Sequence, residues 1–174
     1  MKNIIFILLV FSIQTAFKPF PGGAEDYAPA IRKQAEDMGK ALVKKNYRVY
    51  IKYTDPRVVQ EMGGEAAFAD TLKHYEAQWQ RYNMSVYDIN VEDPSTVVDS
   101  AGELQTSIPV TMQMRVKGGI VTTITTFIGI SKDQGKNWVF MDSGADYHNL
   151  RKKYADLSSK LIVPAPTQPV FKAD

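Results

Sequence analysis

Carboxylate and phenol side chains are the groups in this chain whose chemistry could serve an acid–base reaction. A carboxylate can take a proton from the carbon beside a carbonyl group, and phenols in an apolar cavity can hold the enolate that forms. The chain offers such groups at Asp55, Asp88, Asp142, Tyr47, Tyr50, Tyr53, Tyr75 and Tyr87. Their spacing follows no catalytic motif, so we predict no catalytic residue. An isomerase or lyase-type activity on a hydrophobic carbonyl compound stays as an alternative hypothesis.

Metal and cofactor chemistry finds little support in the sequence. The chain has no cysteine and only two histidines, His74 and His148, which lie far apart and lack a zinc-ligand spacing. There is no phosphate-binding loop, no G-x-S-x-G motif and no dinucleotide fingerprint. We therefore predict neither a metal site nor a cofactor.

Aromatic and methionine side chains suggest a second chemistry, the binding of an apolar ligand. Ligand pockets are mostly apolar with a few polar groups, and methionine adapts to ligands of different shape. The predicted ligand-binding residues, placed between a helix and a sheet, are Tyr75, Trp79, Met112, Met114, Thr126 and Trp138. The same spacing is also typical of an ordinary core, so both interpretations remain open.

Helical periodicity dominates the first half of the chain. Residues 65–82 carry apolar side chains at spacings of three and four, which predicts one face of a helix laid on a core. That stripe consists of Phe68, Leu72, Tyr75, Trp79 and Tyr82. A similar stripe predicts a helix from about residue 25, and Asn46 is placed to cap a shorter second helix.

The stretch YTDPRVVQEMGGE, residues 53–65, predicts a short helix between these two patterns. Thr54 or Asp55 would cap it, Pro56 would occupy its first position, and Gly63 would end it. Arg57 and Glu61, four residues apart, are predicted to form a solvated pair.

After residue 83 the hydrophobic period changes to two, which predicts an antiparallel sheet with one buried and one wetter face. On that basis we expect a three-residue loop, 117–119, which pairs Val116 with Ile120. This pairing would bring the apolar side chains of the strand before the loop and those of the strand after it to the same face of the sheet. Pro109 cannot donate to a ladder and predicts an edge or a bulge.

The first 24 residues are typical of a secretory signal peptide. Lys2 precedes the apolar run 4–13, and cleavage is expected after Ala16 or Ala24. Removal of residues 1–24 takes away Lys2 and Lys18 and leaves 19 basic against 19 acidic residues, so we expect no nucleic-acid partner. The basic clusters 44–48 and 151–153 are interpreted as solvated helix faces. We expect an exported, periplasmic or secreted protein without a stable membrane anchor after cleavage.

The chain resembles the nuclear transport factor 2-like superfamily, also described as cystatin-like cones. The resemblance rests on MGKALVKKNYRVYIKYTDP as the first two helices and on GKNWVFMDS as the last strand. Over most of the mature chain it also resembles exported bacterial members without an assigned activity, through YTDPRVVQEMGG, DQGKNW and the LIVPAPTQPVF tail. The resemblance implies helices on a long curved sheet, and it implies no single function, because the fold hosts isomerases, binding proteins and dimerisation modules.

The sequence thus predicts an α+β domain over residues 25–162, with N-terminal helices packed on a curved antiparallel sheet, followed by a proline-rich surface tail, residues 163–174. The expected function is the binding of a small apolar ligand or a protein partner in a cone-shaped cavity. A dimerisation module is the third hypothesis, and a homodimer would form through the outer sheet face. That face would carry Thr111, Gln113, Thr123, Thr125 and Phe127.

Overall fold

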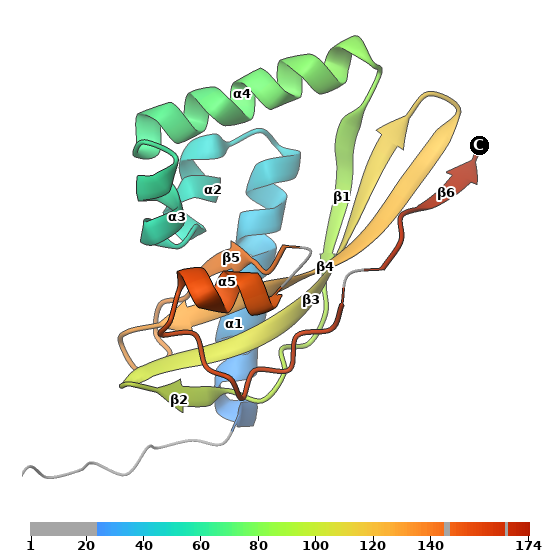
Figure 1. The fold of residues 1–174 in the computed structure, drawn as a ribbon. Helices are drawn as coiled ribbons and strands as arrows, with labels where there is room; N and C mark the ends of the chain where they lie inside the picture. The colour runs from blue at the N-terminus through green and yellow to red at the C-terminus, as the bar shows by residue number, and fades with distance from the viewer. Residues whose placement is uncertain (1–23, 145–146, 166) are drawn as a thin grey trace, which may run out of the picture.

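The computed structural model describes residues 24–144, 147–165 and 167–174, and shows a single α+β domain (Figure 1). The predicted signal peptide therefore lies outside the described residues, except for Ala24. Helices come first, strands follow, and a short helix precedes the last strand. The elements are α1 (Ala24–Val43), α2 (Tyr47–Tyr53), α3 (Pro56–Glu61), α4 (Glu65–Arg81), β1 (Ser85–Val91), β2 (Val98–Ser100), β3 (Glu103–Val116), β4 (Gly119–Ser131), β5 (Val139–Asp142), α5 (Tyr147–Lys153) and β6 (Val170–Ala173).

The helix boundaries follow the predicted local signals. The Asn46 side chain accepts a hydrogen bond from the Val49 N–H at 3.4 Å and begins α2. Asp55 accepts one from the Arg57 N–H at 2.8 Å and caps α3, with Pro56 at its first position. Gly63, with a φ of 85°, takes the left-handed conformation that follows the end of α3. These caps were predictable because each depends on residues within one turn.

The sheet is antiparallel and curved, with the strand order β1-β3-β4-β5. Two short strands, β2 and β6, were not predicted: β2 pairs with β3, and β6 pairs with β4. Pro109 lies in β3 between the segments that pair with β1 and with β2, and its carbonyl accepts from the Glu92 N–H at 3.0 Å. This gap in the pairing is a local edge, as predicted, and it tolerates a residue without an N–H.

The predicted register of the central hairpin is wrong. Val116 pairs with Gly119, so the loop contains two residues, Lys117 and Gly118, rather than three. Met114 then faces the same side as Val121, while Ile128 and Ile130 point to the other side. The prediction failed because it assumed that only one face of the sheet is covered. A slip of one residue changes the face of every side chain, and here both faces have a core to join.

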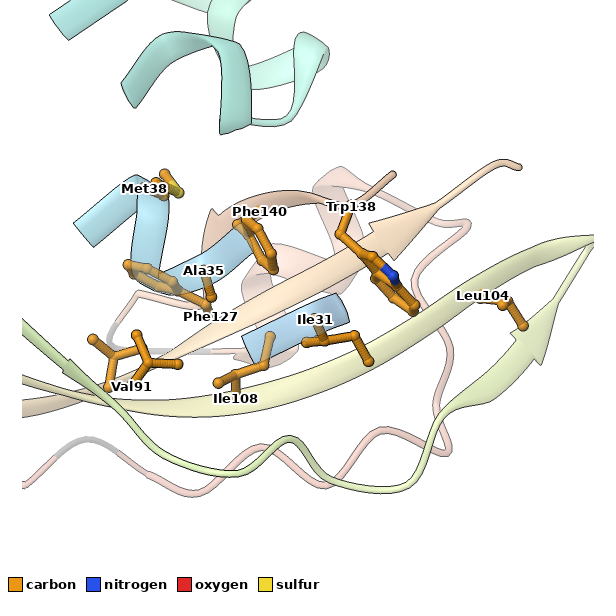
Figure 2. Close-up of a cluster of buried hydrophobic side chains, with 10 residues drawn as sticks. Ile31, Ala35, Met38, Val91, Leu104, Ile108, Phe127, Trp138 and Phe140 are labelled. Carbon is orange, nitrogen blue, oxygen red and sulfur yellow. The ribbon is translucent and has the colours of Figure 1, made fainter. Parts of the chain in front are cut away.

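The first core lies between α1 and the sheet (Figure 2). α1 contributes its predicted stripe, and Trp138 and Phe140 close the core from the β5 side, together with residues of β1, β3 and β4. Its buried members are Ile31, Ala35, Met38, Val91, Leu104, Ile108, Val110, Phe127, Trp138 and Phe140. α1 approaches β1 closely at Gly39, where an added Cβ would lie 2.8 Å from Ile89 Cγ2.

The second core lies on the opposite face of the sheet, under the segment that contains α5. Ile128, Ile130 and Met141 supply the sheet side of this core. Tyr154, Leu157 and Leu161 cover them from the residues that follow α5. The sheet is therefore the middle layer of three, with α1 on one side and the C-terminal segment on the other (Figure 1).

The register also divides the surface that was predicted to form a homodimer. Thr111 and Gln113 lie on the α5 side of the sheet, whereas Thr123, Thr125 and Phe127 lie on the α1 side. Phe127 is buried in the first core. The five residues thus do not make one outer face, for the same reason that the hairpin register was wrong.

Candidate functional site

The six residues that the sequence analysis assigned to ligand binding do not share one cavity. Trp138 is 1% exposed in the first core, and its Nε1–H donates to the Gly135 carbonyl at 2.9 Å. Met112 and Met114 lie on the α1 side of β3, while Thr126 is buried on the α5 side of β4. These four side chains serve the sheet and its two cores.

The other two predicted residues lie on α4 and contact each other. Tyr75 and Trp79 stack with their ring centroids 6.4 Å apart. Tyr75 is 48% exposed, and Tyr82 at the end of the predicted stripe is 73% exposed. Trp79 lines a gap of about 30 Å³ between α1, α4 and β1, which is far too small for a ligand.

The inner face of α4 differs from the predicted one because it includes a carboxylate. Glu76 accepts a hydrogen bond from the Tyr47 hydroxyl at 2.5 Å and forms an ion pair with Lys45. The hydrogen bond from Lys45, then the one from Tyr47, and to a smaller extent the charge of Lys45, lower the pKa of the Glu76 carboxyl. α4 thus binds to α2 partly through polar contacts, so the aromatic stripe is not its only packing face.

A cleft of about 1050 Å³ lies between α2, α3 and the start of α4. It is lined by Arg48, Val49, Ile51, Lys52, Thr54, Pro56, Val59, Gln60, Gly63, Gly64 and Glu65. We call it the α2–α3 cleft. Its lining includes much of the stretch YTDPRVVQEMGGE, which forms the short helix that was predicted and also one wall of this cleft.

Apolar side chains form much of the floor and walls of the α2–α3 cleft, together with Thr54 and Gln60. Ile51 is buried, and Val49 and Val59 are half-buried. On the α3 side the lining residues fall at 56, 59, 60 and 63, a spacing that places them on one side of a helix and its first following residues. An apolar body could therefore lie along α3 without displacing a buried side chain.

The rim of the α2–α3 cleft carries two cations and one anion. Arg48 and Lys52 are exposed and lie four residues apart on α2, so their side chains are neighbours. Neither forms an ion pair with a carboxylate among the described residues, and Lys52 Nζ lies 5.7 Å from the Tyr53 ring centroid. Glu65 begins α4, where the helix dipole favours a negative charge.

Sequence reasoning missed these two cations because it grouped Arg48 with a solvated cluster. One signal could have identified them. α2, whose sequence is YRVYIKY, contains no acidic residue, and the carboxylate of Asp55, three positions after Lys52, is paired with Arg57. A pair of like charges with no local counter-ion is therefore poised to attract an anion from elsewhere.

On the opposite side of α3, Arg57 pairs with the buried Asp55 at the start of the helix and also reaches Asp156 in the C-terminal segment. Asp55 is 1% exposed, and its carboxylate accepts from Arg57 Nε and Nη2, each at 2.9 Å. Arg57 Nη1 also donates to Asp156 at 2.5 Å. The hydrogen bonding of the guanidinium to the Asp55 carboxylate is the first cause of the raised pKa of Arg57. Arg57 thus joins α3 to the segment after α5.

The predicted solvated pair of Arg57 and Glu61 is wrong, because both side chains reach the C-terminal segment instead. Glu61 accepts from Lys153 Nζ at 2.5 Å and from the Tyr154 hydroxyl at 2.8 Å. The hydrogen bond from Lys153 is the main cause of the lowered pKa of the Glu61 carboxyl. One side of α3 therefore lines the cleft, and the other side is held by contacts 92 or more residues away in the chain.

Among the described residues, the tyrosine and aspartate candidates for acid–base chemistry do not meet in the α2–α3 cleft. Burial, with a smaller contribution from the Asp142 charge, raises the pKa of the Tyr50 phenol to about 12. Asp142 accepts from the Thr125 hydroxyl at 2.7 Å and from the Gly144 N–H at 2.9 Å, so it closes a turn. Neither Tyr50 nor Asp142 is among the lining residues of the α2–α3 cleft, where Glu65 is the carboxylate and no histidine is found.

The described part of the chain also shows no metal cluster and no membrane-spanning helix. Within it, no three His, Asp or Glu side chains come close enough to hold a metal ion. Across the same residues, every helix is too short or too polar to cross a membrane.

Comparison of the chain with models of known protein families, with curated proteins and with solved structures gave no match. The assignment to a function therefore depends on the geometry of the α2–α3 cleft.

Proposed function

We propose that this is an exported binding protein whose α2–α3 cleft takes a small amphipathic anion, a molecule with an apolar body and one negatively charged group. The observation that carries the proposal is the combination of an apolar floor with two exposed cations that lack an ion-pair partner in the described structure. This replaces the cone-shaped cavity between helices and sheet as the place of binding.

The size of the cleft supports a small-molecule ligand. Ligand pockets generally measure roughly 300–1,000 Å³ and combine an apolar lining with a few polar groups. The α2–α3 cleft, at about 1050 Å³, is slightly larger than the upper limit of that range. Ile51 and Val59 would contact the apolar body, and the charged group would lie at the rim beside Arg48 and Lys52.

Export and membership of the nuclear transport factor 2-like superfamily are parts of the same proposal with separate support. Export is supported by the sequence of residues 1–24. Membership is supported by the sequence resemblance and by the order of helices followed by a curved sheet. An isomerase-type activity is not proposed, because no pair of described residues places a catalytic base and a catalytic acid side by side in the α2–α3 cleft.

Three ten-carbon ligands with different head groups test the binding proposal. Isothermal titration calorimetry would compare decanoate, decanol and decyltrimethylammonium below their micelle-forming concentrations. We expect decanoate to bind most tightly and the cationic ligand most weakly, because only the anion gains from the two rim cations. Equal affinity for all three would contradict the role of charge, and no binding of any of them would contradict the proposal itself.

Charge-neutralising variants place the binding in the cleft. Arg48→Gln and Lys52→Gln should each weaken decanoate binding by up to about fivefold, the effect of one exposed charge pair, and leave decanol unchanged. Arg81→Gln and Lys160→Gln are matched controls, because both residues are exposed and neither lines the cleft. Val59→Glu should weaken both decanoate and decanol, since it places a carboxylate against the apolar body. A loss that is equal in the controls would contradict this location.

A further inference from the structure

The C-terminal strand β6 pairs with the edge of β4 at residues 119–122, and we call this part of the edge the seat of β6. β6 pairs with the first residues of β4, from Gly119 opposite Ala173 to Thr122 opposite Val170. It lies at the end of an extended segment that runs along the sheet (Figure 1). Every described residue from 164 onward is exposed, so β6 adds no buried side chain to either core.

The edge of β4 accepts β6 because residue 119 is a glycine, whose lack of a side chain lets the two strands approach. An added Cβ at Gly119 would overlap the carbonyl oxygen of Lys172 and come within 2.7 Å of Phe171 Cε2. All three of the atoms nearest to that position belong to β6. Gly118 supplies the positive φ of the hairpin turn, whereas Gly119 does not have one. Gly119 thus leaves room for β6.

Few contacts besides the backbone pairing hold β6 in its seat. Asp174 N–H donates to the Gly118 carbonyl at 3.2 Å, and Arg115 forms an ion pair with Asp174 at 3.3 Å. Both partners of that ion pair are exposed, so it contributes little. A terminal strand with exposed side chains and few buried contacts belongs to the parts of a fold that open most easily.

We propose that the β4 edge at residues 119–122 is a docking site for the strand 170–173, and that a second copy of this chain can supply that strand. Reciprocal exchange of β6 between two copies would give a two-fold symmetric dimer. Each exchanged strand would make the same backbone pairs and meet the same glycine as in the monomer. The contacts of the strand therefore have the same energy in the monomer and in the exchanged dimer. The connecting residues decide which of the two forms is populated.

The connection, residues 162–169, has a sequence that favours an extended path. Its prolines are Pro164, Pro166 and Pro169. The residue before each proline is biased toward extended backbone, which disfavours a compact turn. Eight residues reach at most roughly 26–29 Å, and they join the last buried side chain, Leu161, to the start of β6. We expect that a connection shortened by half keeps β6 from its own β4 edge.

The wild-type chain should be a monomer at micromolar concentration, because a short tether gives the strand a local concentration of about millimolar. Deletion of residues 165–168 removes half of the connection. We expect the deleted chain to form a dimer at micromolar concentration, measured by size-exclusion chromatography with light scattering. Adding Gly119→Ala to the deleted chain should restore the monomer, because the new methyl group blocks the seat on both copies. A deleted chain that stays monomeric, or a dimer that Gly119→Ala does not dissociate, would overturn the proposal.

Cysteine trapping tests the exchange without changing the connection. The chain has no cysteine of its own, so introduced thiols are the only ones present. One copy carries Thr122→Cys and a second copy, with a larger affinity tag, carries Val170→Cys; these residues face each other across β4 and β6. After mixing at high concentration and mild oxidation, we expect a mixed disulfide between the two copies.

The control for random collision pairs the Val170→Cys copy with a copy that carries Ser159→Cys, another exposed position. The mixed disulfide should form at least several times faster with Thr122→Cys than with Ser159→Cys, and Gly119→Ala should remove the difference. Equal rates in the two mixtures would overturn the proposal. These outcomes do not depend on the α2–α3 cleft, so they are independent of the proposed ligand.

Discussion

Removal of the Arg57 side chain should destabilise the protein strongly, because it isolates a buried charge. The Asp55 side chain is 2% exposed and accepts two bonds from the guanidinium. Arg57→Ala removes both and leaves the carboxylate with the backbone N–H of residue 57, at 2.8 Å. Breaking a buried pair by deleting one partner costs about 3–5 kcal/mol. We expect a loss of that order in the free energy of unfolding.

Asp156→Ala is the matched control, because it removes the other partner of the same guanidinium. The Asp156 side chain is 42% exposed, and exposed ion pairs contribute about 0–1 kcal/mol. The Asp156 carbonyl, which accepts from Gln105 Nε2 at 3.0 Å, is kept in the variant. Only the exposed part of the contact is lost, so we expect a small change in stability.

Urea unfolding at neutral pH, followed by circular dichroism, measures both variants. The double variant Asp55→Asn with Arg57→Met should recover part of the loss, because it removes the buried charge as well as its partner. If Arg57→Ala costs less than about 1 kcal/mol, or no more than Asp156→Ala, the Asp55–Arg57 pair does not stabilise the fold as a buried pair should.

Three further predictions concern the core and the charged contacts. Ile108→Ala and Ile128→Ala should each cost about 2–5 kcal/mol in urea unfolding, because both are fully buried on opposite faces of the sheet; a small effect for Ile128 alone would contradict the second core. Gly39→Ala should cost about 1–3 kcal/mol, since its methyl group would lie 2.8 Å from Ile89 Cγ2, and thermal unfolding would show it; an unchanged melting temperature would contradict the close approach. The pKa of Glu76 is lowered in the folded state, so the stability that Glu76 contributes should be present above its unfolded pKa of about 4.3 and be lost as the pH falls through the lower folded pKa. Glu76→Gln should therefore reduce the difference in the free energy of unfolding between neutral and acid pH. An unchanged difference would count against the contact.

The parts of the fold that the sequence predicted are those decided within a few residues. Asn46, Asp55 and Gly63 carry their own hydrogen-bonding or conformational preference, and each acts where expected. The hairpin register was wrong because it depends on what covers each face of the sheet. That cover comes from residues 154–161, which have no local connection with the hairpin.

The candidate site was not predictable from spacing for a similar reason. The predicted binding residues were chosen as aromatic or methionine side chains, and the structure uses most of them in packing. The α2–α3 cleft instead results from the position of α3, which depends on the contacts of Arg57 and Glu61 with residues far along the chain. Only the cations of α2, without a local counter-ion, gave a signal in the sequence.

The most direct test of the proposed binding is a titration of the ¹⁵N-labelled protein with decanoate, followed by two-dimensional amide NMR. The account predicts that the shifted amides cluster at the lining residues of the α2–α3 cleft, between residues 48 and 65. It predicts much smaller shifts for the same residues with decyltrimethylammonium. Shifts centred on the sheet, or an absence of saturable shifts with decanoate, would contradict it.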